Sequence, residues 1–187
     1  MEDRNIGTAP AGGAWPASKK VARRTRFIPL LAALLFTAPA CAEALQGRVV
    51  AVTDGDTVKV LDASHTEWKI RLMGIDAPEK KQAFGIRSKS NLSDLVCNKA
   101  VVVEYSKRDR YGRTVGKILV NGVDANLEQI KAGMAWHYRK YAKEQPIADR
   151  ETYARADEQA RAARRGLWSE AEPVPPWDWR KSKKRRI

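Results

Sequence analysis

The sequence predicts an α+β fold in which a small five-stranded β-barrel is combined with three helices. Short Val-rich segments with alternating apolar and polar residues fill most of residues 46–120, and turn-forming pairs such as Asp54-Gly55 separate them. Beyond residue 85, further segments repeat their apolar residues at intervals of three or four, which indicates amphipathic helices.

The expected strands fall into two groups. Residues 46–53, 57–61 and 68–72 form the first group, which the short intervening turns make a meander. Residues 100–105 and 115–120 form the second group.

The expected helices follow the third and fifth strands. The first covers residues 86–96. The second begins after Asp124, a good capping residue, and the third runs from Pro146 to about Arg165, where Gly166 ends it. Five strands with a helix between the third and fourth give the element order of an OB-fold barrel, a common nucleic-acid-binding scaffold.

Length and charge limit the possibilities. The 187 residues suffice for one well-cored domain with tails and are too few for two ordinary domains. Of the net charge of +13, residues 1–42 contribute +4 and residues 180–187 contribute +6, which leaves +3 for the middle. This balance suggests an anionic partner. It also fits a modestly basic domain with a solvated basic tail.

Residues 1–42 are expected to be a leader and signal peptide. A basic stretch at 19–26 precedes the uncharged residues 27–40, and Ala40-Cys41-Ala42 offers small residues for cleavage. As a helix, the apolar run would span only about 21 Å, short of the roughly 30 Å hydrocarbon core. We therefore expect a periplasmic or secreted protein that meets the membrane only during export. The alternative is a membrane anchor formed by the uncleaved signal or a lipidated Cys41.

Residues 43–168 are expected to form the folded domain and residues 169–187 a tail. Within the tail, residues 173–180 set two tryptophans among prolines, which favours an extended strap lying on the domain. The basic run that follows would add nonspecific phosphate contacts, or it is simply solvated.

Three short clusters combine acidic, basic and turn-forming residues: Asp-Gly-Asp-Thr at 54–57, Arg-Leu-Met-Gly-Ile-Asp-Ala-Pro-Glu at 71–79 and Asp-Arg-Tyr-Gly-Arg at 109–113. Taken singly, each has a structural explanation as a turn or a strand exit. Taken together, they offer carboxylates at strand ends for a hard cation such as Ca²⁺, and guanidinium groups for a phosphate. If they converge, they form a phosphodiester site.

With these clusters the chain resembles the staphylococcal nuclease (thermonuclease) family from about Leu45 to Trp168. The matching strings are Asp-Gly-Asp-Thr-Val-Lys at 54–59 and the clusters at 71–79 and 109–113. The resemblance implies a calcium-dependent endonuclease, a hydrolase that cleaves phosphodiester bonds of DNA or RNA and leaves 3′-phosphates. No stable protein partner is implied, and a monomer is expected.

The resemblance also implies roles for single residues. Asp56 and Asp76 would bind calcium through their side chains and Ala77 through its backbone carbonyl, although the founding member has threonine there. Glu79 matches the acid that activates water. The residues that would contact the phosphate or its neighbours are Arg71, Arg113, Arg110 and Tyr111.

Some assignments stay open. Tyr111 is a substrate contact or a turn tyrosine that caps the barrel. The aromatic cluster at 136–138 lines a base pocket or lies on the surface. For the whole protein, the alternative to a nuclease is a noncatalytic OB-fold module that binds single-stranded nucleic acid; a metal-stabilised envelope protein is a third reading.

Overall fold

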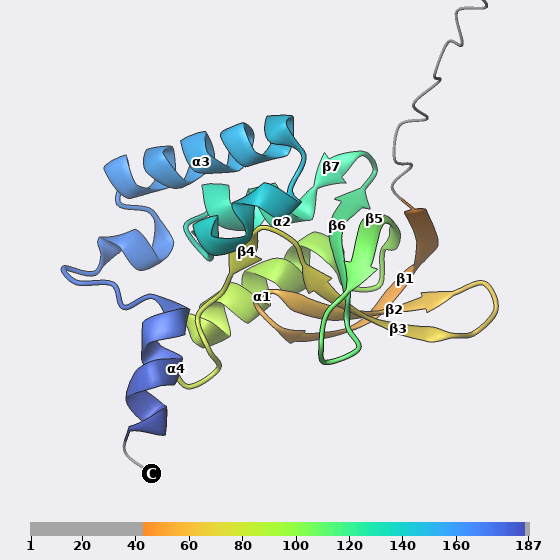
Figure 1. Cartoon of the computed structure of the whole chain (residues 1–187), viewed down its shortest axis with the longest axis horizontal. Coiled ribbons are helices and arrows are strands. Elements are labelled where there is room, and N and C mark those ends of the chain that lie inside the picture. The colour runs from red at the N-terminus through yellow and green to blue at the C-terminus, as the bar shows by residue number, and fades with distance from the viewer. Residues whose placement is uncertain (1–42, 186–187) are drawn as a thin grey trace, which may run out of the picture. The chain divides into compact units, whose positions relative to one another are not determined.

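The computed structural model describes residues 43–185; the expected leader and signal peptide at 1–42 lie outside this range (Figure 1). No helix within the described range is long and apolar enough to cross a membrane. All described residues belong to one compact unit.

The five long strands form a closed barrel (Figure 1). They are β1 (Glu43–Asp54), β2 (Thr57–Asp62), β3 (Glu67–Leu72), β5 (Ala100–Arg108) and β6 (Thr114–Val120). Their order is β3-β2-β1-β5-β6, and a parallel pairing between β3 and β6 closes the sheet on itself. The predicted five-stranded OB-fold barrel is confirmed.

Three two-residue strands complete the sheets. β7 (Val123–Asp124) extends the barrel sheet beside β6, and β4 (Ile75–Asp76) pairs with β8 (Trp136–His137) in a small second sheet. The second sheet matters for the site, because it fixes the chain just after β3.

The three predicted helices are present and a fourth was not predicted. The four are α1 (Gly85–Val96), α2 (Ala125–Lys131), α3 (Ile147–Ala162) and α4 (Pro176–Lys184), with 3₁₀ turns at Arg139–Glu144 and Gly166–Ser169. The Asp124 side chain caps α2 as expected, accepting a hydrogen bond from the Leu127 amide at 3.1 Å.

The expectation of an extended strap over 173–180 is wrong from Pro176 onward. Pro176 starts α4, Asp178 lies in its first turn, and lysines lie in its last turn. A proline at the first helical position is pre-shaped for the helix, and charges of these signs complement its dipole. The helix-forming signals were in the sequence, but the density of prolines and tryptophans obscured them.

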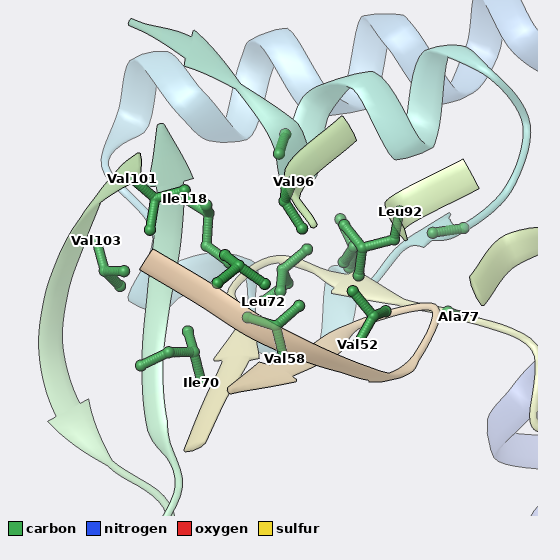
Figure 2. Packing of buried hydrophobic residues seen from close by; sticks show 14 of the residues in the cluster. Val52, Val58, Ile70, Leu72, Ala77, Leu92, Val96, Val101, Val103 and Ile118 are labelled. Carbon is green, nitrogen blue, oxygen red and sulfur yellow. The ribbon is translucent and has the colours of Figure 1, made fainter. Parts of the chain in front are cut away.

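The core lies inside the barrel, with α1 packed against one side. Figure 2 shows Leu92 and Val96 of α1 pointing toward the strand side chains, which include Val58, Ile70 and Ile118. All five are fully buried. The burial of these aliphatic groups gives the barrel its main source of stability.

A smaller cluster joins α3, the second 3₁₀ turn and β8. Trp136, Leu167 and Trp168 are buried in it, and the rings of Trp136 and Trp168 meet edge to face at 4.9 Å. Trp136 and His137 are both buried, so these two do not form a surface aromatic cluster. Tyr138, the next residue, is the one of the three that lines the cavity holding the predicted site residues.

His137 makes the stability of this region depend on pH. Burial lowers the pKa of its imidazole, although the hydrogen bond with Gln145 opposes this effect. As the pH falls, the unfolded state therefore takes up the proton at a higher pH than the folded state does. The resulting stability is fully present above the unfolded-state pKa of about 6.5 and is lost as the pH falls below it.

We expect this loss to show in urea unfolding at about pH 7.5 and about pH 5.5. Wild-type protein should lose up to about 1.4 kcal/mol more of its unfolding free energy over this interval than His137→Gln. The exposed His65 supplies the matched control, because His65→Gln removes the same kind of side chain from a position that is not buried. Equal pH dependence in all three proteins would contradict the assignment.

Candidate active site

One cavity of about 630 Å³ lies at the mouth of the barrel, where the β1–β2 turn, the β3–β4 region, the β5–β6 turn and α4 meet. Every site residue predicted from the sequence lines it: Asp56, Arg71, Asp76, Ala77, Glu79, Arg110, Tyr111 and Arg113. Residues as much as 57 positions apart along the chain are thus brought to one place.

The β1–β2 turn that carries Asp56 is held by two helices. A Cβ atom on Gly55 would lie 1.9 Å from the hydroxyl of Ser88 in α1, so only glycine allows this close approach. Gln129 of α2 donates from its side-chain amide to the Gly55 carbonyl at 2.7 Å. The turn is therefore clamped between α1 and α2, which fixes the backbone of Asp56.

The segment from β3 to Asp76 is also clamped. The Met73 amide donates to the Gly116 carbonyl of β6 at 2.8 Å. The Met73 carbonyl accepts a hydrogen bond from the buried side-chain amide of Asn126 at 3.0 Å. Asp76 then pairs with Trp136 in the second sheet. These contacts hold the Asp76 carboxylate at the cavity, with the residue only 1% exposed.

Asp56 and Asp76 converge on a single nitrogen. Nη2 of Arg71 lies 2.9 Å from Asp56 Oδ2 and 3.0 Å from Asp76 Oδ1. The Ala77 amide also donates to Asp56 Oδ2 at 2.9 Å. The two carboxylates therefore lie close enough together to share one positively charged group.

Arg71 is itself bound by the protein. Its Nη1 donates to the carbonyls of Leu72 and Ile75 at 2.8 and 2.9 Å. With Nη2 on the two carboxylates, the described contacts occupy both terminal nitrogens. The side chain is only 13% exposed, so Arg71 is held more tightly than the sequence alone suggested.

Barrel closure brings Arg113 to the same cavity. Thr114 pairs with Ile70 and Val115 with Arg71 in the parallel β3–β6 contact, which places the residue before Thr114 near Arg71. Arg113 Nε donates to Asp109 Oδ2 at 2.7 Å, and its Nη2 lies at the same distance from that oxygen. The carboxylate of Asp109 therefore holds one edge of the guanidinium.

Asp109 organises the whole β5–β6 turn. Its Oδ1 accepts the backbone amides of Tyr111 and Arg113 at 2.9 and 3.0 Å. Burial acts to raise the pKa of Asp109, but these hydrogen bonds and the Arg113 charge outweigh it, and the pKa is lowered. The carboxylate thus stays charged and keeps the turn in shape.

Tyr111 does not cap the barrel, since its side chain is 67% exposed. Arg110 donates to its hydroxyl at 2.7 Å, and the guanidinium groups of Arg110 and Arg113 lie 4.9 and 5.4 Å from the ring centre. The exposed ring is therefore flanked by two positive charges.

The acidic residues influence one another's protonation. Burial, and next the nearby Asp56 carboxylate, raise the pKa of Asp54 to about 6. Burial likewise raises the pKa of Asp76, while the hydrogen bond from Arg180 and the charge of Arg71 act against this. Negative charge is concentrated here, which is a condition that a bound cation relieves.

No group of three or more His, Cys, Asp and Glu side chains between residues 43 and 185 is close enough to hold a metal ion by itself. The set expected from the sequence has only two such side chains, Asp56 and Asp76, together with the Ala77 carbonyl. The residues present therefore fit a hard cation that also takes backbone and water oxygens.

Comparison with known proteins identifies the family. A family model described as "Staphylococcal nuclease homologue" matches residues 69–170. An Escherichia coli protein named "Uncharacterized endonuclease" is 43% identical over 161 residues, which cover 84% of this chain and 99% of the relative. This protein belongs to the staphylococcal nuclease family.

Other family members agree. A Haemophilus influenzae protein named "Uncharacterized endonuclease" is 44% identical over 137 residues, covering 73% of this chain and 74% of its own length. A Shigella flexneri protein named "Micrococcal nuclease" is 39% identical over 168 residues, covering 85% and 93%.

One part of the site lies beyond the residues matched by the family model. Arg180 of α4 also lines the cavity. Its Nη2 lies 2.7 Å from Asp76 Oδ2 and its Nη1 lies 2.8 Å from Glu79 Oε1. The sequence pattern did not single out Arg180, because this residue opens the C-terminal basic run, which was expected to be a tail.

Proposed function

We propose that this member of the staphylococcal nuclease family is a calcium-dependent endonuclease that hydrolyses phosphodiester bonds of DNA or RNA and leaves 3′-phosphates. The convergence of three acids and two arginines on one cavity carries the proposal. The names of the relatives, endonuclease and micrococcal nuclease, support the same activity.

In this proposal Asp56, Asp76 and the Ala77 carbonyl hold the calcium ion. When bound, the ion supplies positive charge that offsets the negative charge of the phosphoryl group. Both carboxylates are buried, Asp56 at 7% and Asp76 at 1% exposure, so a bound ion would offset the cost of keeping two negative charges away from water.

Glu79 is the proposed acceptor of the proton from the attacking water. Its side chain is 42% exposed and lines the cavity three residues after Asp76, so it is open to solvent and near the ion ligands. A general base must lie within hydrogen-bond reach of the water it activates, and an exposed carboxylate on the cavity wall suits that role.

Arg71 and Arg113 are the proposed donors to the phosphoryl oxygens. Guanidinium groups stay charged at any working pH and offer paired N–H donors. Their hydrogen bonds to the phosphoryl oxygens strengthen as negative charge develops on these oxygens in the transition state. For Arg71 this requires Nη2 to leave the two carboxylates that it binds in this structure. Tyr111 and Arg110 extend the surface toward the neighbouring nucleotide.

A cleavage assay tests the function. The protein is incubated with denatured DNA and with RNA, in calcium or in excess chelator, and the product ends are examined. We expect cleavage in calcium only, with 3′-phosphate ends. Binding of nucleic acid without cleavage would instead support the noncatalytic OB-fold module. If the protein neither binds nor cleaves nucleic acid, both functions are refuted.

We also propose that the protein is exported, to the periplasm or beyond the cell. The support is the basic, apolar and small-residue pattern at 19–42. Cell fractionation and N-terminal sequencing test it. A mature terminus near Glu43 in the periplasm or medium is expected, and a cytoplasmic protein that keeps residues 1–42 would contradict it.

A further inference from the structure

Arg180 brings a positive charge from the C-terminal helix to the acidic wall of the cavity. Beyond its two short contacts with Asp76 and Glu79, its Nη1 also lies 3.4 Å from Asp76 Oδ1. One guanidinium thus spans the two carboxylates to which the proposed function gives the ion and the attacking water. The inference that follows rests on that proposed function.

We propose that Arg180 is a built-in competitor of the calcium ion. In the cation-free protein it occupies Asp76 and Glu79; binding of the cation displaces it and loosens α4 from the cavity. The affinity for calcium and the docking of α4 are therefore linked.

The contacts of Asp76 set the arginines and a cation in competition. Its Oδ1 is bound by Arg71 and its Oδ2 by Arg180. A cation that binds this carboxylate directly comes close to both guanidinium charges and competes with them for the two oxygens.

Arg180 is the easier of the two to displace. The side chain of Arg71 is 13% exposed and is also held by two backbone carbonyls. The side chain of Arg180 is 42% exposed, and water can replace its contacts at lower cost. Arg180 also blocks Glu79, which must be free to take a proton.

Charge repulsion favours the exchange. Arg180 and a divalent ion are both positive and would both bind Asp76, so the ion would face the guanidinium at short range. Like charges crowded in a partly buried site repel strongly, so the ion and Arg180 disfavour each other.

Helix α4 is attached weakly enough to move. Of its nine residues only Pro176 is buried, and a helix this short is marginal without tertiary contacts. Apart from Arg180, its main attachment is Trp177, which stacks on Tyr138 at 5.4 Å with an interplanar angle of 13°. Just before the helix, the Gln82 side chain donates to the Val174 carbonyl.

Calcium binding without nucleic acid tests the competition. Calcium chloride is titrated by calorimetry into the purified protein at about 0.15 M salt. Arg180→Ala should bind calcium about 5- to 50-fold more tightly than wild type, since it removes charge-assisted hydrogen bonds that solvent partly screens.

Lys181→Ala is the matched control. It removes one positive charge from the same helix, but Lys181 pairs with Asp178 rather than with the cavity carboxylates. Its calcium affinity should stay within about twofold of wild type. If Lys181→Ala tightened binding as much as Arg180→Ala, the effect would be a general charge effect and the competition would be refuted.

Hydrogen exchange of the α4 amides gives a second readout. In wild type, calcium should speed exchange across Pro176–Lys184, and in Arg180→Ala exchange should already be fast without calcium. An unchanged calcium affinity in Arg180→Ala, or α4 protection that calcium does not alter, would overturn the proposal.

Cleavage measured on the same preparations separates the two hypotheses. If wild type cleaves DNA and Arg180→Ala binds calcium no more tightly, the competition fails and the nuclease function stands. If Arg180→Ala tightens calcium binding but no protein cleaves nucleic acid, the function fails and the competition stands. If Arg180→Ala keeps wild-type calcium affinity and loses cleavage, Arg180 acts on the substrate and the competition is refuted.

Discussion

Replacing Glu79 with glutamine should lower the rate of calcium-dependent DNA cleavage by about two to four orders of magnitude. Glutamine keeps the size of the side chain and its place in the cavity, but its amide cannot accept a proton from water at neutral pH. Gel-shift measurements of DNA binding in calcium should change only a few-fold, because Arg71 and Arg113 remain. The expected loss is therefore in turnover and not in affinity.

The matched control is Glu128→Gln. Glu128 lies on α2, pairs with Lys131 at 2.7 Å and does not line the cavity, so its loss of charge should leave cleavage near the wild-type rate. A Glu79→Gln enzyme that turned over within about tenfold of wild type would remove Glu79 from proton transfer.

Because Glu79 also binds Arg180, the loss has a second possible origin. A guanidinium released from Glu79 would be free to block the cavity. The double variant Glu79→Gln/Arg180→Ala separates the two explanations. We expect it to stay as slow as Glu79→Gln, whereas recovery of the rate would assign the loss to Arg180.

The sequence was most informative where local chemistry determines structure. Asp54-Gly55 predicted the β1–β2 turn, and Asp124 predicted the start of α2. Both signals act over a few residues, through the backbone freedom of glycine and a side-chain cap. The eight candidate site residues could be named because the clusters at 54–57, 71–79 and 109–113, taken together, match the pattern of one family.

The mutual arrangement of these residues was not predictable from periodicity. The parallel β3–β6 pairing joins strands more than 40 residues apart, and no local pattern encodes such a contact. The roles of Asp109 in holding Arg113 and of Gly55 in admitting α1 are likewise visible only in three dimensions.

The largest omission was the C-terminal segment. Prolines at 173, 175 and 176 suggested an extended chain, although a proline also suits the first position of a helix. The lysine-rich run suggested a tail exposed to solvent, because runs of like charge usually lie in solvent. What distinguishes Arg180 is that its partners are Asp76 and Glu79, more than 100 residues earlier.

Arg113→Lys should also cause a large loss of cleavage, although the charge is kept. The guanidinium of Arg113 is held on one edge by Asp109 through Nε and Nη2, which directs its remaining N–H groups. Lysine has a single ammonium group, so it cannot keep the Asp109 contact and also present a paired donor to a phosphoryl oxygen. We expect the cleavage rate at saturating DNA to fall about 10²- to 10³-fold.

Two further variants separate geometry from charge. Arg48→Lys makes the same exchange on β1, where Arg48 donates to the Asn98 carbonyl at 2.8 Å and does not line the cavity; its rate should match wild type.

Arg113→Ala removes the charge as well. If charge alone mattered, the lysine variant would cleave nearly as fast as wild type and only the alanine variant would be slow. If paired donors matter, both variants will be slow and their calcium affinities will stay near the wild-type value, because the described contacts of Arg113 are with Asp109 and not with the Asp56–Asp76 pair.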